Sequence, residues 1–337
     1  MKICVVGAGA IGGLLGAKLA LAGEEVTLID RGAHLEAIRR NGLKLVMADG
    51  TEHVAENVRA TDDFTAAGRH ELVILAVKAY VIEHVAPQLP RLFEADGMLL
   101  TAQNGLPWWY FQRHGGPYDG RRIECLDPRG TIARHVEPGR IIGCVVYPAG
   151  EIRSPGVVRH VEGDRFAIGE PDGSKTERVQ RVADALARAG FKAFVLDNIR
   201  AEIWLKLWGN MSFNPISALT HATLEDICRF APTRELAATM MREAQAIAGK
   251  LGIEFRVPIE KRIAGAEKVG AHKTSTLQDI EAGREIENEA LLGAVIELAR
   301  LTGTPAPACE TVYALLCLLG KTMLGERSSV RLVRLAA

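Results

Sequence analysis

A glycine-rich hexapeptide near the N-terminus has the residue types and spacing that bind a dinucleotide. The segment reads Gly7-Ala8-Gly9-Ala10-Ile11-Gly12 and matches the pattern G-x-G-x-x-G. In this pattern the first glycine permits a tight turn, the second lets a pyrophosphate approach the backbone, and the third allows a helix to pack closely on a strand. N–H groups at the start of the following helix bind the phosphates. A glycine-rich turn that holds no ligand is the structural alternative.

Residues that follow two apolar runs bear on the choice of cofactor. The run 25–29 is followed by Asp30 and Arg31. An acid at this point accepts the ribose 2′-OH of NAD, whereas an arginine accommodates the 2′-phosphate of NADP, so the two residues favour different cofactors. Lys78 follows the run 71–77 and is either a second positive charge for a ligand or a solvated strand-end lysine. We therefore predict a nicotinamide dinucleotide, with its 2′ group undecided.

A lysine and two asparagines recur at four-residue spacing in the second half of the chain. Lys206, Asn210 and Asn214 lie at i, i+4 and i+8, which places them on one face of a helix. Because their neighbours are largely apolar, these groups need polar partners or a cleft. A solvated stripe on an amphipathic helix is the alternative. Pro215 disfavours helical geometry at Asn214, so we expect a bend or break there that presents the amide outward.

A second polar segment lies at residues 274–287. Ser275 is followed three residues later by Gln278, which fits a capping box, so helix capping explains this serine as well as ligand binding does. Glu287 is either a surface glutamate or a site residue. Spacing alone does not separate these alternatives.

The first half of the chain alternates between strand-like and helical patterns. A strand-like run at 2–6, the glycine motif, a helical segment at 11–22 and a strand-like run at 25–29 make one βαβ unit. Helical patterns follow at 34–41 and 175–189. Further strand-like runs lie at 71–77, 98–101, 141–147, 156–161, 165–168 and 194–196.

From about residue 198 helical patterns dominate. They lie at 199–213, 223–231, 233–251, 258–268, 284–301 and 308–322. We therefore predict an α/β fold, in which an N-terminal Rossmann-type dinucleotide-binding domain (1–198) precedes an all-helical C-terminal domain (199–337).

The composition excludes several classes of protein. The chain has 337 residues, 48% hydrophobic and 24% charged, which is typical of a two-domain globular protein. Lys plus Arg number 41, as do Asp plus Glu, so we do not expect a nucleic-acid-binding protein that works by neutralising phosphates. Six scattered cysteines without a CxxC pair indicate reduced thiols and a cytoplasmic location. With no signal peptide and no run of 18 apolar residues, we expect no membrane segment, and no metal site.

Taken together, the motifs resemble those of the ketopantoate reductase family, the 2-dehydropantoate 2-reductases. The matching segments are Gly7–Gly12, Val77-Lys78-Ala79, Gln103-Asn104-Gly105, Trp204-x-Lys206, Asn210, Asn214-Pro215, Ser275-x-Leu277-Gln278-Asp279 and Glu287. Their order and spacing agree with the family from residue 1 to about 300. The combination of Lys-x3-Asn-x3-Asn-Pro with Ser-x-Leu-Gln-Asp makes the resemblance specific.

The resemblance implies NADPH-dependent reduction of 2-dehydropantoate to pantoate, on the route to pantothenate and coenzyme A. Lys206 matches the family's proton donor, since an ammonium can protonate and stabilise the alkoxide that hydride transfer leaves. The resemblance assigns substrate binding to Asn104, Lys206, Asn210, Asn214 and Ser275. It assigns cofactor binding to residues 7–12 with Arg31, Lys78, Asn104, Ala149 and Glu287, so the helical domain is expected to bind the substrate.

The segment 107–140 departs from the family, which has a short connection after its Asn-Gly. The inserted residues are rich in arginine and aromatic side chains, among them Trp108, Trp109 and Tyr110. Because the segment leaves the edge that binds ligand, it could cap the pocket, alter substrate choice or contact another subunit. A solvent loop with a few packed aromatic side chains is the alternative.

Two alternative functions stay open beside NADP(H)-linked reduction of 2-dehydropantoate. One is an NAD(H)-linked reductase of a different 2-oxo acid, which Asp30 and the insertion favour. The other is a dinucleotide-sensing module without turnover, against which the intact Lys206 argues. The expected partner is a small 2-oxo acid, and a homodimer is compatible with a helical domain of this size.

Overall fold

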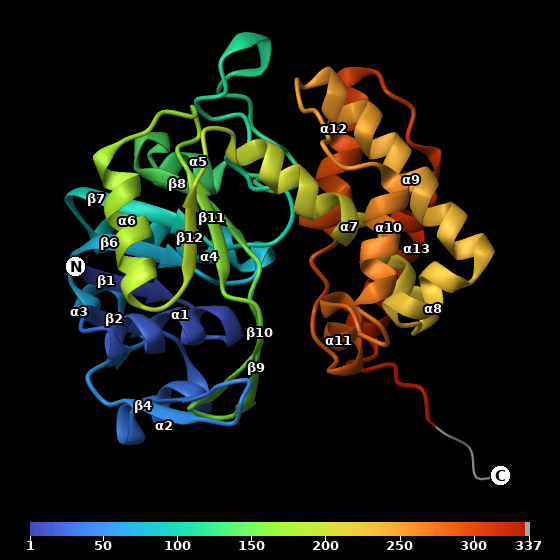
Figure 1. Cartoon of the computed structure of the whole chain (residues 1–337). Helices are drawn as coiled ribbons and strands as arrows, with labels where there is room; N and C mark the ends of the chain where they lie inside the picture. The colour runs from blue at the N-terminus through green and yellow to red at the C-terminus, as the bar shows by residue number, and fades with distance from the viewer. Residues whose placement is uncertain (334–337) are drawn as a thin grey trace. The chain divides into compact units, whose positions relative to one another are not determined.

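The computed structural model describes residues 1–333 and divides into two compact units (Figure 1). The first comprises residues 1–104, 108–122 and 127–199. The second comprises residues 200–333, together with 105–107 and 123–126. Two short pieces of the predicted insertion region thus belong to the helical unit.

The first unit is built on an eight-stranded sheet with the order β12-β11-β8-β7-β6-β1-β2-β5. Its strands are β1 (Lys2–Val6), β2 (Glu25–Ile29), β5 (Arg59–Thr61), β6 (His70–Leu75), β7 (Phe93–Thr101), β8 (Ile141–Val146), β11 (Arg165–Gly169) and β12 (Lys192–Val195). All neighbours are parallel except β8 and β11. From β5 to β8 the order is that of a Rossmann fold, which confirms the predicted class.

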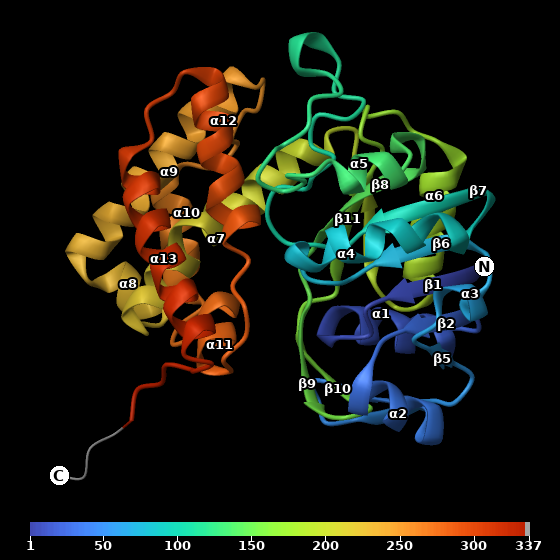
Figure 2. The ribbon, with the colours of Figure 1, turned by 180° about the vertical axis from the view of Figure 1, so that it is seen from behind.

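Helices cover both faces of this sheet. They are α1 (Ala10–Leu21), α2 (Gly32–Asn41), α3 (Phe64–Ala67), α4 (Ile82–Val85), α5 (Thr131–His135) and α6 (Glu177–Arg188). Figure 1 shows α6 in front of the sheet, and α4 comes to the front in Figure 2. Leu14, Val182 and Leu186 are fully or almost fully buried and pack into the same core as β1 and β2.

Four strands end in register at one edge of the large sheet. Val6 pairs with both Ile29 and Leu75, and Leu75 pairs with Thr101. The residues that follow these strands therefore emerge side by side at the carboxyl edge, where parallel α/β sheets bind their ligands.

A second sheet, with the order β4-β3-β10-β9, packs against α1. Its strands are β3 (Leu43–Val46), β4 (Glu52–Ala55), β9 (Ala149–Ser154) and β10 (Val157–Glu162). Of these only β10 lies at a predicted strand. In β9, for example, the last four residues are exposed, and only Ile152 among them is apolar. The strand therefore shows no alternation of apolar and polar residues.

The second unit is helical, as predicted. Its helices are α7 (Ile199–Thr220), α8 (Leu224–Arg229), α9 (Ala231–Lys250), α10 (Ile259–Lys268), α11 (Ser275–Glu281), a π-helix (Glu289–Gly293), α12 (Ala294–Thr302) and α13 (Pro307–Gly325). The predicted helix 284–301 is instead an irregular segment followed by the π-helix and α12.

One helix bears on the expectation that nothing spans a membrane. Among residues 1–333, α13 is long and apolar enough to do so by length and composition alone. Cys309, Val312, Leu316 and Met323 are buried on one side of it, and it packs against α9 and the π-helix. One helix of this kind is weak evidence of a membrane span, because the helices of a folded domain pass the same test, and α13 itself carries Glu310 and Lys321.

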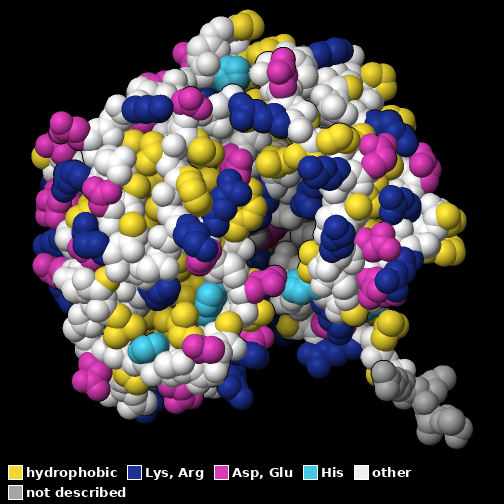
Figure 3. Space-filling model, in the orientation of Figure 1, with side chains coloured by type: hydrophobic (Ala, Val, Ile, Leu, Met, Phe, Trp, Pro, Cys, Tyr) yellow, Lys and Arg dark blue, Asp and Glu magenta, His cyan; other side chains and the backbone are white. Residues whose placement is uncertain are grey.

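The surface has mixed charge and the cysteines form no disulfides, as the composition predicts. In Figure 3 basic and acidic side chains are interspersed over the face in view. All six cysteines are free, and four are buried. Burial raises the pKa of the Cys4 thiol to about 12 and that of Cys228 to about 11, so neither is a reactive thiolate at neutral pH.

Candidate functional site

The glycine motif forms the turn between β1 and α1. Gly7 has a φ of +93°, and its N–H donates to the Ile29 carbonyl at 2.8 Å. A Cβ on Gly12 would lie 1.8 Å from the Gly7 oxygen, so only glycine lets α1 start this close to the strand. Gly7 and Gly12 therefore have the roles in turn and packing that the motif predicts.

Gly9 is different, because no atom of residues 1–333 explains its lack of a side chain. Its φ of −62° is open to any residue, and a Cβ there would have none of the described atoms within 4 Å. Gly9 caps α1, whose N-terminus has no side-chain cap and no acidic residue in its first turn. Gly9, Ala10 and Ile11 are partly exposed, whereas Ala8 is fully buried. The backbone N–H groups at this open start of α1 fit a dinucleotide pyrophosphate.

Asp30 and Arg31 follow β2 at the same edge. The Asp30 Oδ1 accepts the backbone N–H of Arg31 at 2.7 Å, so one carboxylate oxygen is engaged within the turn. Arg31 caps α2 through its extended backbone, and its side chain is exposed. Lys78 lies three residues beyond Leu75 at the end of β6. Both cations are thus placed at the edge where the ribose of a dinucleotide lies in this fold.

Gln103 lies in the matching segment Gln103-Asn104-Gly105, but the resemblance assigns it no role. Its Nε2 donates to the carbonyls of Leu75 at 2.6 Å and Val77 at 3.3 Å, which ties the end of β7 to the end of β6. Its Oε1 is buried and has no hydrogen-bond partner among residues 1–333. A buried acceptor without a partner at the carboxyl edge fits a ligand that donates a hydrogen bond, such as a nicotinamide carboxamide. Its place beside Asn104 was the available signal.

Gly105 begins a contact within the helical unit. It has a φ of +87°, and a Cβ on it would lie 2.3 Å from the Ala290 oxygen. The next residue, Leu106, donates its N–H to the same oxygen at 2.8 Å. Ala290 belongs to the π-helix, and Glu287 lies just before it with 9% exposure. The surface alternative for Glu287 is therefore wrong, and the π-helix has the irregularity common near functional sites.

Lys206 and Asn210 lie on α7, and both are partly exposed. The opposite side of the helix is held by Trp208, whose Nε1 donates to the Met241 carbonyl at 2.7 Å and whose ring lies 4.2 Å from that of Phe255. Because this indole is buried, the rotation of α7 is determined and with it the direction of the polar face.

Asn214 does not point outward as predicted. The helix continues through Pro215 to Thr220, and Asn214 is 7% exposed. Its Nδ2 donates to the Ser275 Oγ at 3.3 Å. Proline costs about 3 kcal/mol inside a helix, but residues 211–218 are all buried, and their packing outweighs that cost.

Ser275 is not the cap of α11. Thr274 is the N-cap, and its hydroxyl accepts the Leu277 N–H at 3.3 Å. The Ser275 side chain is exposed and bonded to Asn214, so the capping interpretation of Ser275 is wrong. The chain thus brings together the lysine, two amides and a hydroxyl of the second unit, along about 12 Å of α7 at a rise of about 1.5 Å per residue.

Arg262 on α10 was missed by sequence reasoning. A Cβ on Gly209 would lie 2.1 Å from the Arg262 Nη2 and 2.8 Å from its Cζ, so the guanidinium lies directly over this glycine. Gly209 is buried in the middle of α7 with an ordinary backbone, and it lies beside the face of Lys206. A glycine without a conformational reason in a helix was the available signal.

Ala149 starts β9 and pairs with Glu162. Its neighbour Gly150 approaches the glycine loop, since a Cβ there would lie 3.3 Å from the Ala10 oxygen. The hairpin of β9 and β10 therefore lies beside the start of α1. This position is compatible with a backbone contact from Ala149 to the cofactor, and that role stays a prediction.

The aromatic residues of the insertion are buried in the first unit. Trp109 donates from Nε1 to the Thr101 Oγ1 at 3.0 Å, and Gly143 leaves room for its ring. Trp108, Tyr110 and Phe111 are buried as well. Packed aromatic side chains agree with the structural alternative, and the roles in capping the pocket, in substrate choice and in subunit contact stay predictions.

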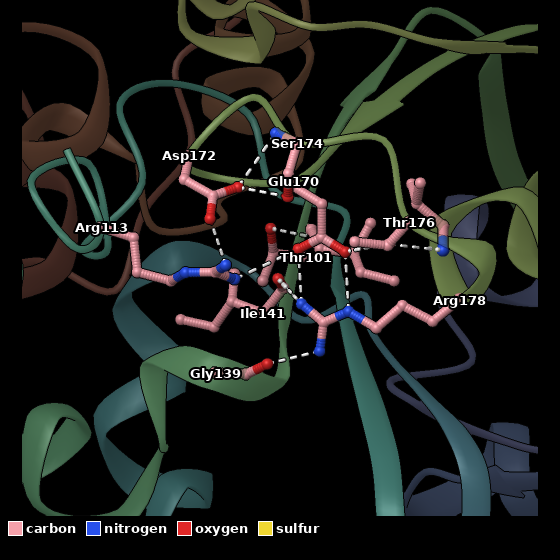
Figure 4. Close-up of polar contacts among 11 residues, drawn as sticks. Thr101, Arg113, Gly139, Ile141, Glu170, Asp172, Ser174, Thr176 and Arg178 are labelled. Carbon is pink, nitrogen blue, oxygen red and sulfur yellow. Dashed lines mark hydrogen bonds and ion pairs between the residues drawn. The ribbon is translucent and has the colours of Figure 1, made fainter. Parts of the chain in front are cut away.

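Arg113 joins the insertion to a buried carboxylate (Figure 4). Glu170 is fully buried and accepts from Arg178 Nε at 2.7 Å, Thr176 Oγ1 at 2.6 Å and Arg113 Nη1 at 3.3 Å. Burial alone would raise the pKa of this carboxyl, but the bonds from Arg178 and Thr176 and the two guanidinium charges outweigh it and lower the pKa. Glu170 is therefore an ionised anchor for the insertion. Arg113 also pairs with Asp172.

No group of three or more His, Cys, Asp and Glu side chains that could hold a metal occurs in the part of the chain that the structure describes. The candidate site is thus made of backbone N–H groups, cations, amides and a hydroxyl. The cofactor-binding candidates, other than Glu287, lie in the first unit, and the Lys206 group lies in the second.

Comparisons with known proteins agree with this division. Residues 3–109 match the family "Ketopantoate reductase PanE/ApbA", and residues 198–319 match "Ketopantoate reductase PanE/ApbA C terminal". The chain is 51% identical over 316 residues to a 2-dehydropantoate 2-reductase of Mesorhizobium japonicum, covering 94% of this chain and 96% of that protein.

Two solved structures show the same fold. A Ralstonia solanacearum protein assigned to the ketopantoate reductases is 40% identical with a TM-score of 0.91, over 95% of this chain and 98% of that one. A D-mandelate dehydrogenase solved with NADH and anilino(oxo)acetate has a TM-score of 0.82 at 23% identity, over 96% and 99%.

Proposed function

Since the chain belongs to the ketopantoate reductase family, a family of NAD(P)H-dependent oxidoreductases, we propose that it reduces 2-dehydropantoate to pantoate with NADPH. The observation that carries this proposal is the unbroken helix α7, which presents Lys206 and Asn210 on the face that ends at Asn214 and its bonded partner Ser275. The identity of 51% to a 2-dehydropantoate 2-reductase over nearly the whole chain supports the same substrate.

The residues of the helical unit have distinct tasks in this reaction. A dinucleotide held by the glycine loop would supply a hydride for the C2 carbonyl carbon, and the carbonyl oxygen would then take the electron pair of the C=O π bond. The Lys206 Nζ donates a proton to this oxygen and becomes a neutral amine, which regains its proton from solvent. Before transfer its positive charge polarises the carbonyl. The amides and the hydroxyl hold the substrate's own polar groups.

A carboxylate substrate needs positive charge near these groups. Arg262 supplies it at Gly209, beside the face that carries Lys206. A guanidinium binds a carboxylate through two parallel N–H bonds. We assign the substrate carboxylate to this part of the unit, with Asn214 and Ser275 as neutral partners.

NADPH is favoured over NADH by the arrangement after β2. Asp30 already accepts from the Arg31 backbone, which leaves less of its charge directed at a ribose. The exposed Arg31 side chain and Lys78 together outweigh the single carboxylate and fit a 2′-phosphate. NADH is the second candidate, because Asp30 stands where an acid accepts the 2′-OH.

The two parts of the chain have separate tasks in this proposal. Residues 1–198 bind the cofactor and residues 199–337 bind the substrate, with the insertion anchored to the first part through Arg113. The protein acts in the cytoplasm, where its cysteines stay reduced. The intact Lys206 group argues against a sensing module without turnover.

The substrate is tested by comparing kcat/KM for 2-dehydropantoate with that for other 2-oxo acids, such as 2-oxoisovalerate and phenylglyoxylate, at saturating NADPH. We expect 2-dehydropantoate to exceed the others by at least about 100-fold, because its hydroxyl is an additional group for the amides to bind. A different acid preferred by tenfold or more would identify this chain as a reductase of that acid.

A further inference from the structure

The side chain of His34 links the glycine loop to a turn more than 120 residues away along the chain. His34 lies in the first turn of α2 and is partly buried. Its Nε2 lies 3.0 Å from the Ala8 carbonyl oxygen, and its Nδ1 lies 3.0 Å from the Gly156 nitrogen. None of the functions assigned above uses this histidine.

The two partners determine the state of the ring. The Gly156 N–H can only donate, so Nδ1 must be the unprotonated nitrogen that accepts. The Ala8 oxygen can only accept, so Nε2 carries the proton and donates. Both bonds are therefore satisfied together by the neutral ring with its proton on Nε2.

The bond to Ala8 orients the peptide that precedes Gly9. In a trans peptide the carbonyl oxygen and the following N–H point in opposite directions from the same plane. Holding the Ala8 oxygen toward His34 therefore turns the Gly9 N–H away from it. A side chain at Gly9 would meet no described atom within 4 Å, so the space beside this residue is open to a ligand phosphate.

The bond to Gly156 holds the turn between β9 and β10. Gly156 follows Pro155 and has a φ of +76°, as the third residue of a type II turn does. Its carbonyl accepts the Lys44 N–H of β3 at 2.9 Å, and a Cβ on it would lie 2.9 Å from the Ala37 Cβ on α2. The turn therefore bonds to β3 through the Gly156 carbonyl and packs on α2, and the bond from the Gly156 N–H to His34 is a further contact of the same residue with α2.

The hairpin that this turn closes reaches α1. A Cβ on Gly13 would lie 2.7 Å from the Val158 Cγ2, so β10 packs closely against the first turns of the helix. His34 therefore bonds to both bodies that flank the phosphate-binding backbone, the loop itself and the hairpin packed on α1.

We propose that His34 is a positioning residue for dinucleotide binding. It fixes the Ala8–Gly9 peptide in the orientation that receives the pyrophosphate and holds the β9–β10 hairpin against that loop. This inference rests on the proposed function, because it presumes that the glycine loop binds a nicotinamide dinucleotide.

The test measures the Kd of NADPH and of NADP⁺ by nucleotide fluorescence and calorimetry on the full chain. We expect His34→Ala to weaken both about tenfold, since two bonds that orient the loop are lost. His34→Gln has a carboxamide that both accepts and donates, so we expect it to restore part of the affinity. At saturating NADPH, kcat should change by less than about threefold, because His34 is not placed in the chemistry.

A control variant separates this role from simple damage to α2. Arg40→Ala removes an exposed side chain of the same helix, whose Nε donates to the Glu36 carbonyl one turn earlier, and it should keep the wild-type Kd. Amide hydrogen exchange at Gly156 should accelerate in His34→Ala and not in Arg40→Ala. Equal Kd values for wild type, His34→Ala and His34→Gln would overturn the inference. If wild type itself binds neither NADP(H) nor NAD(H), the proposed function fails instead.

Discussion

Lys206 is the side chain on which the proposed chemistry depends most directly. Replacing it with alanine removes the proton donor while leaving the glycine loop and the amides of α7 in place. We expect Lys206→Ala to lower kcat by at least about 100-fold, the lower range for general acid catalysis. Steady-state kinetics of wild type and variant at saturating NADPH measure this.

The control for Lys206 is another lysine of the helical unit. Lys261 on α10 is exposed, and Lys261→Ala should keep kcat within about twofold. The Kd of NADPH should be unchanged in both variants. A near-normal kcat for Lys206→Ala would remove this lysine from the mechanism.

His70 gives a prediction about stability at the residue scale. It is fully buried on β6, and desolvation together with the nearby Lys2 charge lowers the pKa of its ring. The folded state therefore prefers the neutral ring, and the unfolded state, with a pKa near about 6.5, takes up the proton first. The stability that this group contributes is complete above about pH 6.5 and falls as the pH drops below it, by up to about 1.4 kcal/mol per pH unit.

Urea denaturation of wild type and His70→Leu at about pH 7.0 and about pH 5.5, on either side of the unfolded pKa, tests this. The variant should lose less stability than wild type between the two pH values, because one titrating group is gone. His53→Ala, an exposed histidine on β4, serves as the control and should keep the wild-type difference. Identical pH dependence of wild type and His70→Leu would contradict this role for the buried ring.

The residues of the site show what local rules predict and where they fail. The turn and packing roles of Gly7 and Gly12 follow from the motif, because they depend on neighbours within the same βαβ unit. The outward position of Asn214 was wrong, because the Pro215 rule considers only the local backbone, whereas buried neighbours decide the outcome. Arg262 could not be found from spacing, since its contact with Gly209 joins two helices.

At the scale of elements, a substitution at Gly105 tests the contact between its turn and the π-helix. Alanine there must adopt a φ of +87° and place its Cβ 2.3 Å from the Ala290 oxygen, a backbone atom that cannot move aside. We expect Gly105→Ala to destabilise the helical unit by about 2 kcal/mol beyond the cost of the backbone conformation. It should also lower kcat/KM, because the neighbouring Asn104 is displaced.

The matched control is Gly252, also in the helical unit. It has a φ of +80°, but a Cβ there would have none of the described atoms within 4 Å. Gly252→Ala therefore loses stability because alanine disfavours the left-handed backbone, but its Cβ meets no neighbouring atom as the Cβ at position 105 does. Scanning calorimetry of the two variants isolates the steric part, and equal unfolding temperatures would show that the contact with Ala290 contributes nothing.

The elements differ in how well the sequence predicts them. β1, α1 and β2 are predicted within a residue or two, because glycine or a polar residue ends each run. β4, β5 and β9 were missed, since short edge strands with exposed side chains carry no burial pattern. β3 was missed although three of its four residues are buried, because a run of four residues is too short to show a period. The π-helix replaces a predicted α-helix, and no sequence pattern distinguishes one extra residue in a turn.

At the scale of the whole molecule, equal numbers of basic and acidic residues are compatible with anionic ligands. A dinucleotide and a carboxylate are small, so a few placed cations suffice: Arg31 and Lys78 in the first unit, Lys206 and Arg262 in the second. The neutral balance excludes dependence on a long polyanion and says nothing against a short one.

This chain is proposed to reduce a 2-oxo acid with a hydride from a nicotinamide dinucleotide. The oxidation of NADPH and of NADH with 2-dehydropantoate, followed side by side by absorbance, tests it most directly. We expect turnover that yields one pantoate per cofactor oxidised, with a higher kcat/KM for NADPH than for NADH. Absence of turnover with both cofactors would contradict the claim.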